Sequence, residues 1–271
     1  MILIRQITKL GIAVFTLALL MLIVNSCSNF NIYPTSEDIK LGKDLAAEIK
    51  KDTKDYPLLN KPEVKNYVQG IVNTILKSPL IEYRGQFAYT VEIINRDDII
   101  NAFCTPGGYI YVYTGLLKFI DNEATLAGIL AHEIAHAERR HATQRISKAY
   151  GAQELSNAVL GEKKTKMGEL AANMFSGLSL LNNSRDDEYE ADEYSFKYLQ
   201  STQWYPGAIK FFFDKIKNSV NDNDLKVLLS THPLPQDRYD KVIEMLKKAN
   251  VPPPNEKNTL YHKYFEFKKN L

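Results

Sequence analysis

Residues 123–141 read EATLAGILAHEIAHAERRH, a stretch rich in alanine and free of proline. These residue types favour an α-helix, so we expect His132 and His136 to lie one turn apart on the same helix face. Two imidazoles at this spacing can bind one Zn²⁺ ion. Glu133 lies about 100° further round the helix, where its carboxylate can take a proton from a zinc-activated water. The stretch therefore predicts a catalytic zinc site.

A catalytic zinc needs a third protein ligand. His141 follows His136 by five residues, which in a continuous helix is about 140° away from the pair and makes it a poor ligand. His262 is expected at the surface. His232 lies in the rigid stretch THPLP (residues 231–235) and remains possible.

An acidic stretch offers a stronger source of the third ligand. Residues 184–192 read SRDDEYEAD, and Glu188 and Asp192 are spaced for one helix face. One of these carboxylates could bind zinc while the other orients a ligand histidine. Glu190 is a competing ligand, although helical geometry places it on another face. Considered alone, the stretch could also be a charged helix start favoured by the helix dipole.

These motifs together resemble one family. The pattern His-Glu-x-x-His, followed about 50 residues later by Glu-x-x-x-Asp, is similar to the zinc endopeptidase family of the CAAX prenyl protease, HtpX and BepA. Residues 101–117 resemble the strand beside the active site of that family, and residues 231–238 resemble its His-Pro-x-x-x-x-Arg loop. The resemblance covers roughly residues 37–249.

The resemblance implies a role for each matching residue. One Zn²⁺ ion per chain is expected, held by His132, His136 and Glu188. Glu133 is implied as the catalytic base and Asp192 as the carboxylate that orients a ligand. His232 or Arg238 is expected to stabilise the oxyanion, because the motif loop joins them six positions apart. His232 could instead cap the zinc in a resting state.

The predicted fold class is α+β, a mostly helical protease domain with a small β-sheet next to the active-site helix. Helices are expected to begin near Thr35 and Pro62, and strands at residues 87–94 and 109–113. Helical patterns continue from residue 122 to residue 249, with one of the breaks near Gly151. We expect one metallopeptidase domain over residues 37–250. The tail, residues 251–271, begins with prolines, is rich in lysine and is predicted to lie outside the compact core.

The first 26 residues predict an export signal. Arg5 and Lys9 precede the uncharged apolar run of residues 10–24, which is too short to span a bilayer comfortably. The run ends shortly before Cys27, which resembles a bacterial lipoprotein signal with lipid attached to Cys27. Residues 27–36 would be a tether, and Ser28 favours the periplasmic face of the outer membrane. An ordinary signal peptide or a tilted anchor helix are the alternatives.

Composition excludes other classes of protein. The 34 lysines and arginines nearly balance the 32 acidic residues, giving a net charge of +2, which argues against a nucleic-acid partner. Two cysteines in 271 residues exclude a disulfide-dense scaffold and a cysteine-rich metal site.

The expected partners are therefore unfolded or misassembled polypeptides of the cell envelope and, through the lipid, a membrane. An extended substrate is expected to add a strand at a sheet edge formed by Gly108, Tyr109, Ile110 and Tyr111. The alternatives are an envelope chaperone or assembly factor with low or latent protease activity, and a zinc hydrolase of cell-wall peptides.

Overall fold

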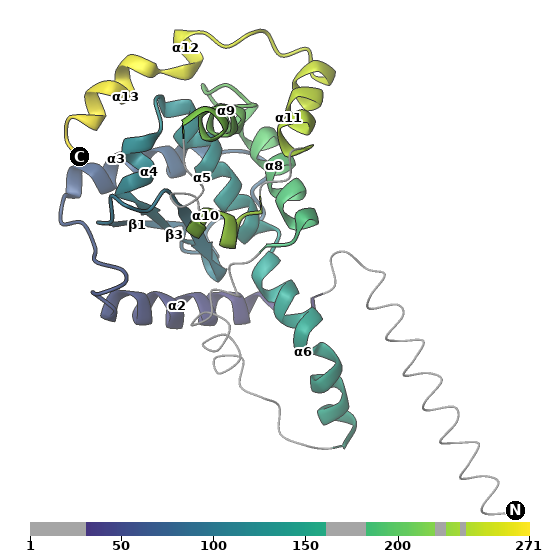
Figure 1. Ribbon diagram of the computed structural model, residues 1–271. Helices are drawn as coiled ribbons and strands as arrows, with labels where there is room; N and C mark the ends of the chain where they lie inside the picture. Colours follow the sequence, from purple (N-terminus) through teal and green to yellow (C-terminus); the bar gives the residue numbers. More distant parts are fainter. Residues whose placement is uncertain (1–30, 161–182, 220–225, 234–236) are drawn as a thin grey trace, which may run out of the picture.

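The computed structural model describes residues 31–160, 183–219, 226–233 and 237–271 (Figure 1). The expected signal peptide, the expected lipid attachment site at Cys27 and the first part of the expected tether lie outside these residues. Within the described ranges, no helix combines the length and the apolar character that a membrane span requires. The predicted α+β class is confirmed: helices predominate around one small sheet.

Helix α5 (Glu123–Glu138) is the centre of the fold, and all of its residues are buried. The Asn122 side chain caps it by accepting a hydrogen bond from the backbone N–H of Thr125. Alanines and Gly128 let neighbouring elements approach closely. A Cβ added at Gly128 would lie 2.7 Å from the backbone nitrogen of Ile209, so α9 (Ile209–Ser219) can pack there only against glycine.

The sheet has three strands in the order β1 (Thr90–Ile94), β3 (Tyr109–Tyr113) and β2 (Ala102–Thr105). Strand β3 runs parallel to β1 and antiparallel to β2. Ile110 and Val112 belong to the main core, which includes α3 (Pro62–Ile75) and α5. Tyr111 and Tyr113 pack in a second cluster that includes Ile49 of α2 (Thr35–Lys51). The sheet therefore lies between α2 and the central helix (Figure 1).

The predicted substrate edge is wrong. Gly108, Tyr109, Ile110 and Tyr111 belong to the turn before β3 and to β3 itself, which is the central strand and is paired on both sides. Its backbone groups are used by β1 and β2, so no further strand can add there. Among the described residues, β2 is the edge strand that packs against α5.

Other helices surround this centre: α4 (Thr114–Phe119), α6 (His141–Leu160), α8 (Arg185–Leu199), α10 (Lys226–Thr231) and α11 (Asp237–Lys248). The predicted helix starts at Thr35 and Pro62 are confirmed. The predicted break at Gly151 is wrong, because α6 continues through it. One glycine in a helix costs only about 1 kcal/mol, so the helix can tolerate it.

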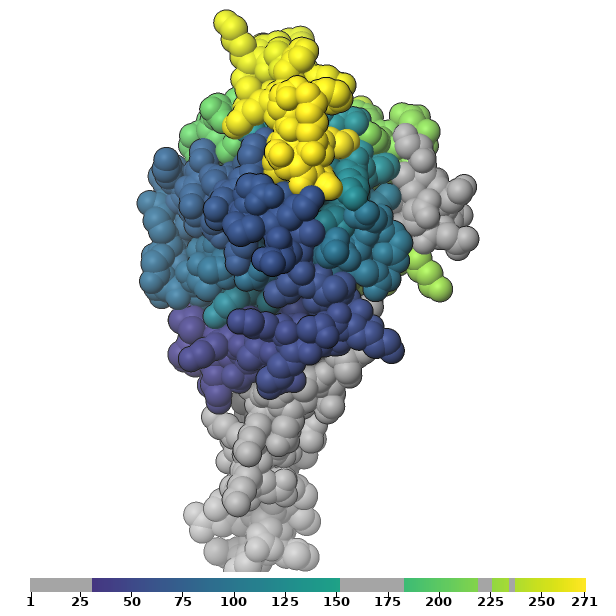
Figure 2. Space-filling model, turned by 90° about the vertical axis from the view of Figure 1, so that its left-hand side faces the viewer, coloured from purple at the N-terminus to yellow at the C-terminus, as the bar shows by residue number. Residues whose placement is uncertain are grey.

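The C-terminal segment forms α12 (Glu256–Thr259) and α13 (Tyr261–Lys268) and packs on the core. The expectation that this segment lies outside the compact core is therefore wrong. Tyr264 and Phe267 are buried, and the Phe267 ring stacks on Tyr67 of α3 at 3.9 Å. Figure 2 shows the C-terminal residues, in yellow, lying against the blue surface that includes α3. A lysine-rich helix can bury one aromatic face and keep its charges in water.

Candidate metal centre

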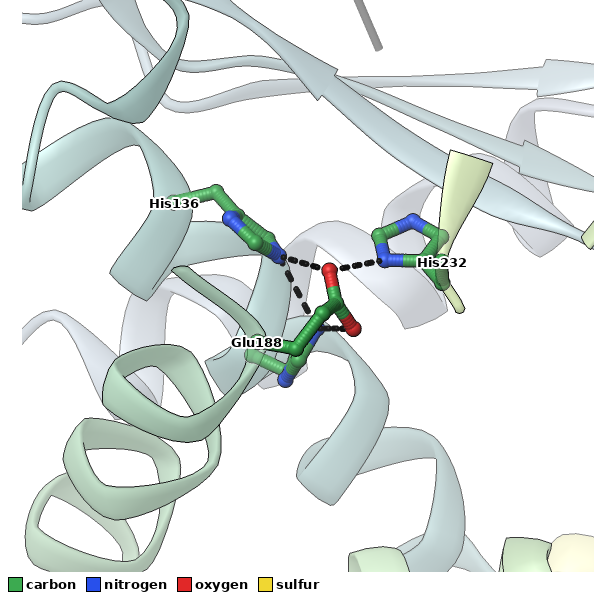
Figure 3. A group of neighbouring side chains, drawn as sticks. His136, Glu188 and His232 are labelled. Atoms are coloured by element: carbon green, nitrogen blue, oxygen red, sulfur yellow. Dashed lines mark hydrogen bonds and ion pairs between the residues drawn. The ribbon is translucent and has the colours of Figure 1, made fainter. Parts of the chain in front are cut away.

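Four side chains from three parts of the chain converge beside α5. His132 and His136 come from α5, Glu188 comes from α8, and His232 follows α10. One possible ligand atom from each lies within 4.8 Å of the others, and all four residues are buried. Figure 3 shows the Glu188 carboxylate between the rings of His136 and His232.

The distances within this group are short. The Nε2 atoms of His132 and His136 are 2.9 Å apart. The Glu188 carboxylate lies 3.4 Å from His132 Nε2, 3.2 Å from His136 Nε2 and 3.0 Å from His232 Nδ1. Nitrogen and carboxylate oxygen ligands at such a buried point are the donor set that zinc prefers. The side chains therefore fit a zinc ion.

Helix α8 starts at a place that directs Glu188 toward α5. Ser184 and Asp187 form a capping box at its N-terminus. Glu188 and Asp192 then lie on the face that packs against α5, where both carboxylates reach His132. Glu190 lies on another face and does not join the group.

Asp192 and Arg238 lie next to the group and hold two of its side chains, His132 and Glu188, in place. One Asp192 oxygen lies 2.9 Å from His132 Nδ1, where its charge favours a proton on that nitrogen and leaves Nε2 facing the other ligands. Arg238 donates to both Asp192 oxygens at 2.7 Å and lies 2.6 Å from the Glu188 carboxylate.

The sequence model of peptidase family M48 matches residues 62–246. The chain belongs to peptidase family M48.

Individual relatives agree with this membership. The chain is 29% identical to the beta-barrel assembly-enhancing protease of Escherichia coli over 67% of its own length, and 30% identical to that of Yersinia pestis over the same share. It covers 39% of each of these proteins, about two fifths of their length. It is also 25% identical to the mitochondrial metalloendopeptidase OMA1 of Schizosaccharomyces pombe, over 88% of this chain and 69% of that protein. The predicted family resemblance is confirmed.

The electrostatics of the M48 centre favour a cation. Burial acts to lower the pKa of His132, but the Glu188 and Asp192 carboxylates outweigh it and raise the pKa to about 9. Burial and the charge on His132 lower the pKa of His136 well below its usual range. The two carboxylates thus attract positive charge to the centre. In the absence of a metal, His132 can carry a proton there, whereas His136 stays neutral.

Glu133 is buried on the neighbouring face of α5. Its carboxylate lies 3.5 Å from His232 Nε2 and accepts a backbone hydrogen bond from Cys104 of β2. Burial raises the pKa of Glu133. A carboxylate held next to the ligands, but outside them, is suited to accept and return a proton.

Arg238 is held by the carboxylates next to the centre. It is 3% exposed, and its guanidinium is engaged by Asp192 and Glu188. This geometry fits a residue that positions carboxylates. Arg238 also lines a pocket with Glu133 and His232, and its expected contact with the oxyanion stays a prediction. His262 is exposed, as expected.

Sequence reasoning missed Asn183. Its side-chain amide nitrogen lies 3.2 Å from His136 Nε2 and 3.3 Å from His232 Nδ1, while its oxygen accepts from Arg145 at 2.6 Å. Asn183 belongs to no pattern that would mark it in the sequence, since only the folded chain brings it to the ligands.

Proposed function

We propose that the chain is a zinc-dependent endopeptidase of the bacterial cell envelope that cleaves unfolded or misassembled polypeptides. The observation that carries this proposal is the convergence of His132, His136 and Glu188 next to Glu133. Membership in peptidase family M48 supports the reaction class. The bacterial relatives named beta-barrel assembly-enhancing protease support the envelope setting.

His132, His136 and Glu188 would hold one zinc ion, and His232 would be displaced or retained as a fourth ligand. A bound zinc polarises the scissile carbonyl and makes a water acidic at neutral pH. Glu133 takes the proton of the attacking water and returns it to the leaving amine. Asp192 keeps His132 in the tautomer that can bind, and Arg238 holds Asp192 in place.

The substrate would pair with the free edge of β2. The backbone N–H of Tyr113 donates to the Asn101 carbonyl at 3.1 Å. Because peptide groups alternate along an antiparallel strand, those of Ala102 and Cys104 face away from β3. Because the Cys104 N–H already donates to Glu133, the substrate would pair with the Ala102 peptide group and the Cys104 carbonyl. This places an extended peptide beside Glu133, and main-chain pairing tolerates many side chains. This suits substrates recognised by being unfolded.

The position of His232 is consistent with an inactive resting form of the centre, in which His232 would be a fourth zinc ligand. It lies with Glu188 and Glu133 in the position of a fourth ligand. If His232 caps the centre, His232→Ala will increase cleavage of casein. If it stabilises the oxyanion, the same variant will lose activity by about 10²–10³-fold. Equal rates in the variant and the parent would remove both roles.

We further propose that residues 1–26 are a lipoprotein signal, that Cys27 carries the lipid and that residues 27–36 are a tether. The protein would then act at the periplasmic face of the outer membrane, as one metallopeptidase domain over residues 37–250 with the segment 251–271 docked on it.

The decisive test is Glu133→Gln in the full chain loaded with zinc. We expect the variant to bind zinc as the parent does and to lose about 10²–10⁴-fold of its casein cleavage. Cleavage by the variant at the parental rate would refute the hydrolytic role.

A second candidate is an envelope chaperone or assembly factor with low or latent protease activity. The fourth-ligand position of His232 favours it, because a capped centre hydrolyses slowly. In that case, both the parent and Glu133→Gln would suppress aggregation of an unfolded protein to the same extent, and neither would cleave it.

A further inference from the structure

The second ring nitrogen of His136 has an unusual partner. His136 Nδ1 lies 2.7 Å from Nδ1 of His141, and His141 Nε2 lies 3.0 Å from the Glu190 carboxylate. His141 is 1% exposed. We propose that His141 and Glu190 are positioning residues which, through this chain of hydrogen bonds, hold His136 in its zinc-binding tautomer. The inference rests on the proposed zinc site.

The direction of the chain follows from its last member. An ionised carboxylate only accepts hydrogen bonds, so Glu190 requires the proton of His141 to be on Nε2. His141 Nδ1 then carries a lone pair and accepts a hydrogen bond from His136 Nδ1–H. His136 is left with its Nε2 lone pair directed at the other ligands.

Asn183 gives independent evidence for the same tautomer. Its oxygen accepts from Arg145 at 2.6 Å, which fixes the orientation of the amide. The amide nitrogen therefore faces His136 Nε2 at 3.2 Å and must donate to it. His136 Nε2 is thus an acceptor, in agreement with a proton on Nδ1.

The backbone between α5 and α6 makes this contact possible. Arg140 has a positive φ of 57° and interrupts the helix between Glu138 and His141. The Arg140 side chain is paired with the buried Asp38 at 2.6 Å, which stabilises this turn. His141 is thereby brought back beside His136 instead of pointing away from it.

Glu190 is held by a second contact, since Arg139 donates to its other oxygen at 2.8 Å. The two ligand histidines therefore depend on two separate carboxylates of α8. Asp192 contacts His132 directly, whereas Glu190 reaches His136 only through His141. A change at Glu190 should therefore weaken zinc binding by His136 and leave the contact between Asp192 and His132 intact.

Zinc affinity tests this inference independently of cleavage. The zinc dissociation constant of the full chain would be measured by competition with a fluorescent chelator, for the parent and for His141→Leu, His141→Asn and Glu190→Gln. Melting of the zinc-free forms would be followed in parallel. The matched control is Glu193→Gln on the same helix, because Glu193 is exposed and pairs with Lys197 away from the metal centre.

We expect His141→Leu to weaken zinc binding about 10–100-fold, the range seen for lost partners of metal ligands. His141→Asn keeps an acceptor near the Nδ1 position and should recover most of the affinity. Glu190→Gln should weaken binding several-fold, and the control should equal the parent.

A zinc dissociation constant within about twofold of the parent in folded His141→Leu would overturn the relay. If His141→Leu does not fold, an unchanged zinc dissociation constant in Glu190→Gln would overturn the proposal instead. Loss of zinc-free stability with unchanged zinc affinity would show a merely structural role. A parent that binds no zinc overturns both proposals, whereas a parent that binds zinc without cleaving casein overturns only the proposed function.

Discussion

Two buried glutamates, Glu123 and Glu188, differ in the kind of partner that surrounds them. Both are 0% exposed. Glu123, at the start of α5, accepts hydrogen bonds from the Tyr67 hydroxyl, from Trp204 Nε1 at 2.9 Å and from Lys263, whose Nζ is 2.8 Å away. Glu188 faces Arg238 and three imidazoles, those of His132, His136 and His232.

The difference distinguishes a structural charge from a functional one. Every partner of Glu123 is a donor, so its negative charge is satisfied by the protein alone. The imidazoles around Glu188 can each present either a proton or a lone pair. Their lone pairs and the Glu188 carboxylate are directed at one position. Such a group of ligand atoms is satisfied by binding a metal cation from solution.

The largest effect is expected at Glu188. Glu188→Gln removes an anionic ligand, and we expect zinc affinity to fall by more than the roughly 100-fold of a lost supporting residue. Casein cleavage should be lost with it. Chelator competition measures the affinity, and a variant that still binds zinc like the parent would show that Glu188 is structural.

An intermediate effect is expected at Glu123. Glu123→Gln weakens hydrogen bonds to a charged group and should lower the free energy of unfolding by about 1.5–3 kcal/mol. Zinc affinity should stay within about twofold of the parent, because the metal centre lies two turns away on α5. Urea unfolding of the zinc-free chain measures the first quantity. A large loss of zinc affinity would remove the distinction between the two glutamates.

A smaller effect is expected where α13 docks beside Glu123. The Tyr264 hydroxyl donates to the Leu117 carbonyl at 2.7 Å. Tyr264→Phe should lower the free energy of unfolding by about 0.5–1.5 kcal/mol without changing zinc affinity. Tyr261→Phe on the same helix is the control, because Tyr261 is 46% exposed. Equal free energies of unfolding for the two variants would mean that the Tyr264 hydrogen bond contributes little to stability where α13 packs beside Glu123.

Local spacing was enough to predict the helical part of the centre. Residues four apart share a helix face in any fold, so His132 with His136, and Glu188 with Asp192, could be paired from the sequence. The capping residues Asn122 and Ser184 can also be recognised from the local sequence. The convergence of the two helices could be inferred only from the family resemblance.

Apart from the helix break at Gly151, the wrong predictions concern contacts between residues far apart in the sequence. The β3 sequence YIYVY is apolar on both faces, which is typical of a central strand, but its neighbours are set by pairing that no local pattern records. His141 lies outside the metal-binding group, as expected, but its contact with His136 was missed because its position was judged along a continuous helix, whereas the chain turns at Arg140. The tail was judged by its lysines, although Tyr264 and Phe267 share the face that packs on α3.

The contact between Lys263 and Glu123 joins residues 140 positions apart in the chain. While the polypeptide is being synthesised, the Glu123 carboxylate lacks this cation until α13 has left the ribosome. The N-terminal end of α5 therefore gains this charge partner only after the residues of the metal centre have been made. A chain cut short before α13 would leave the buried Glu123 carboxylate without this cation, so we expect it to unfold more readily than the whole chain, even though α13 contributes no side chain to the metal centre.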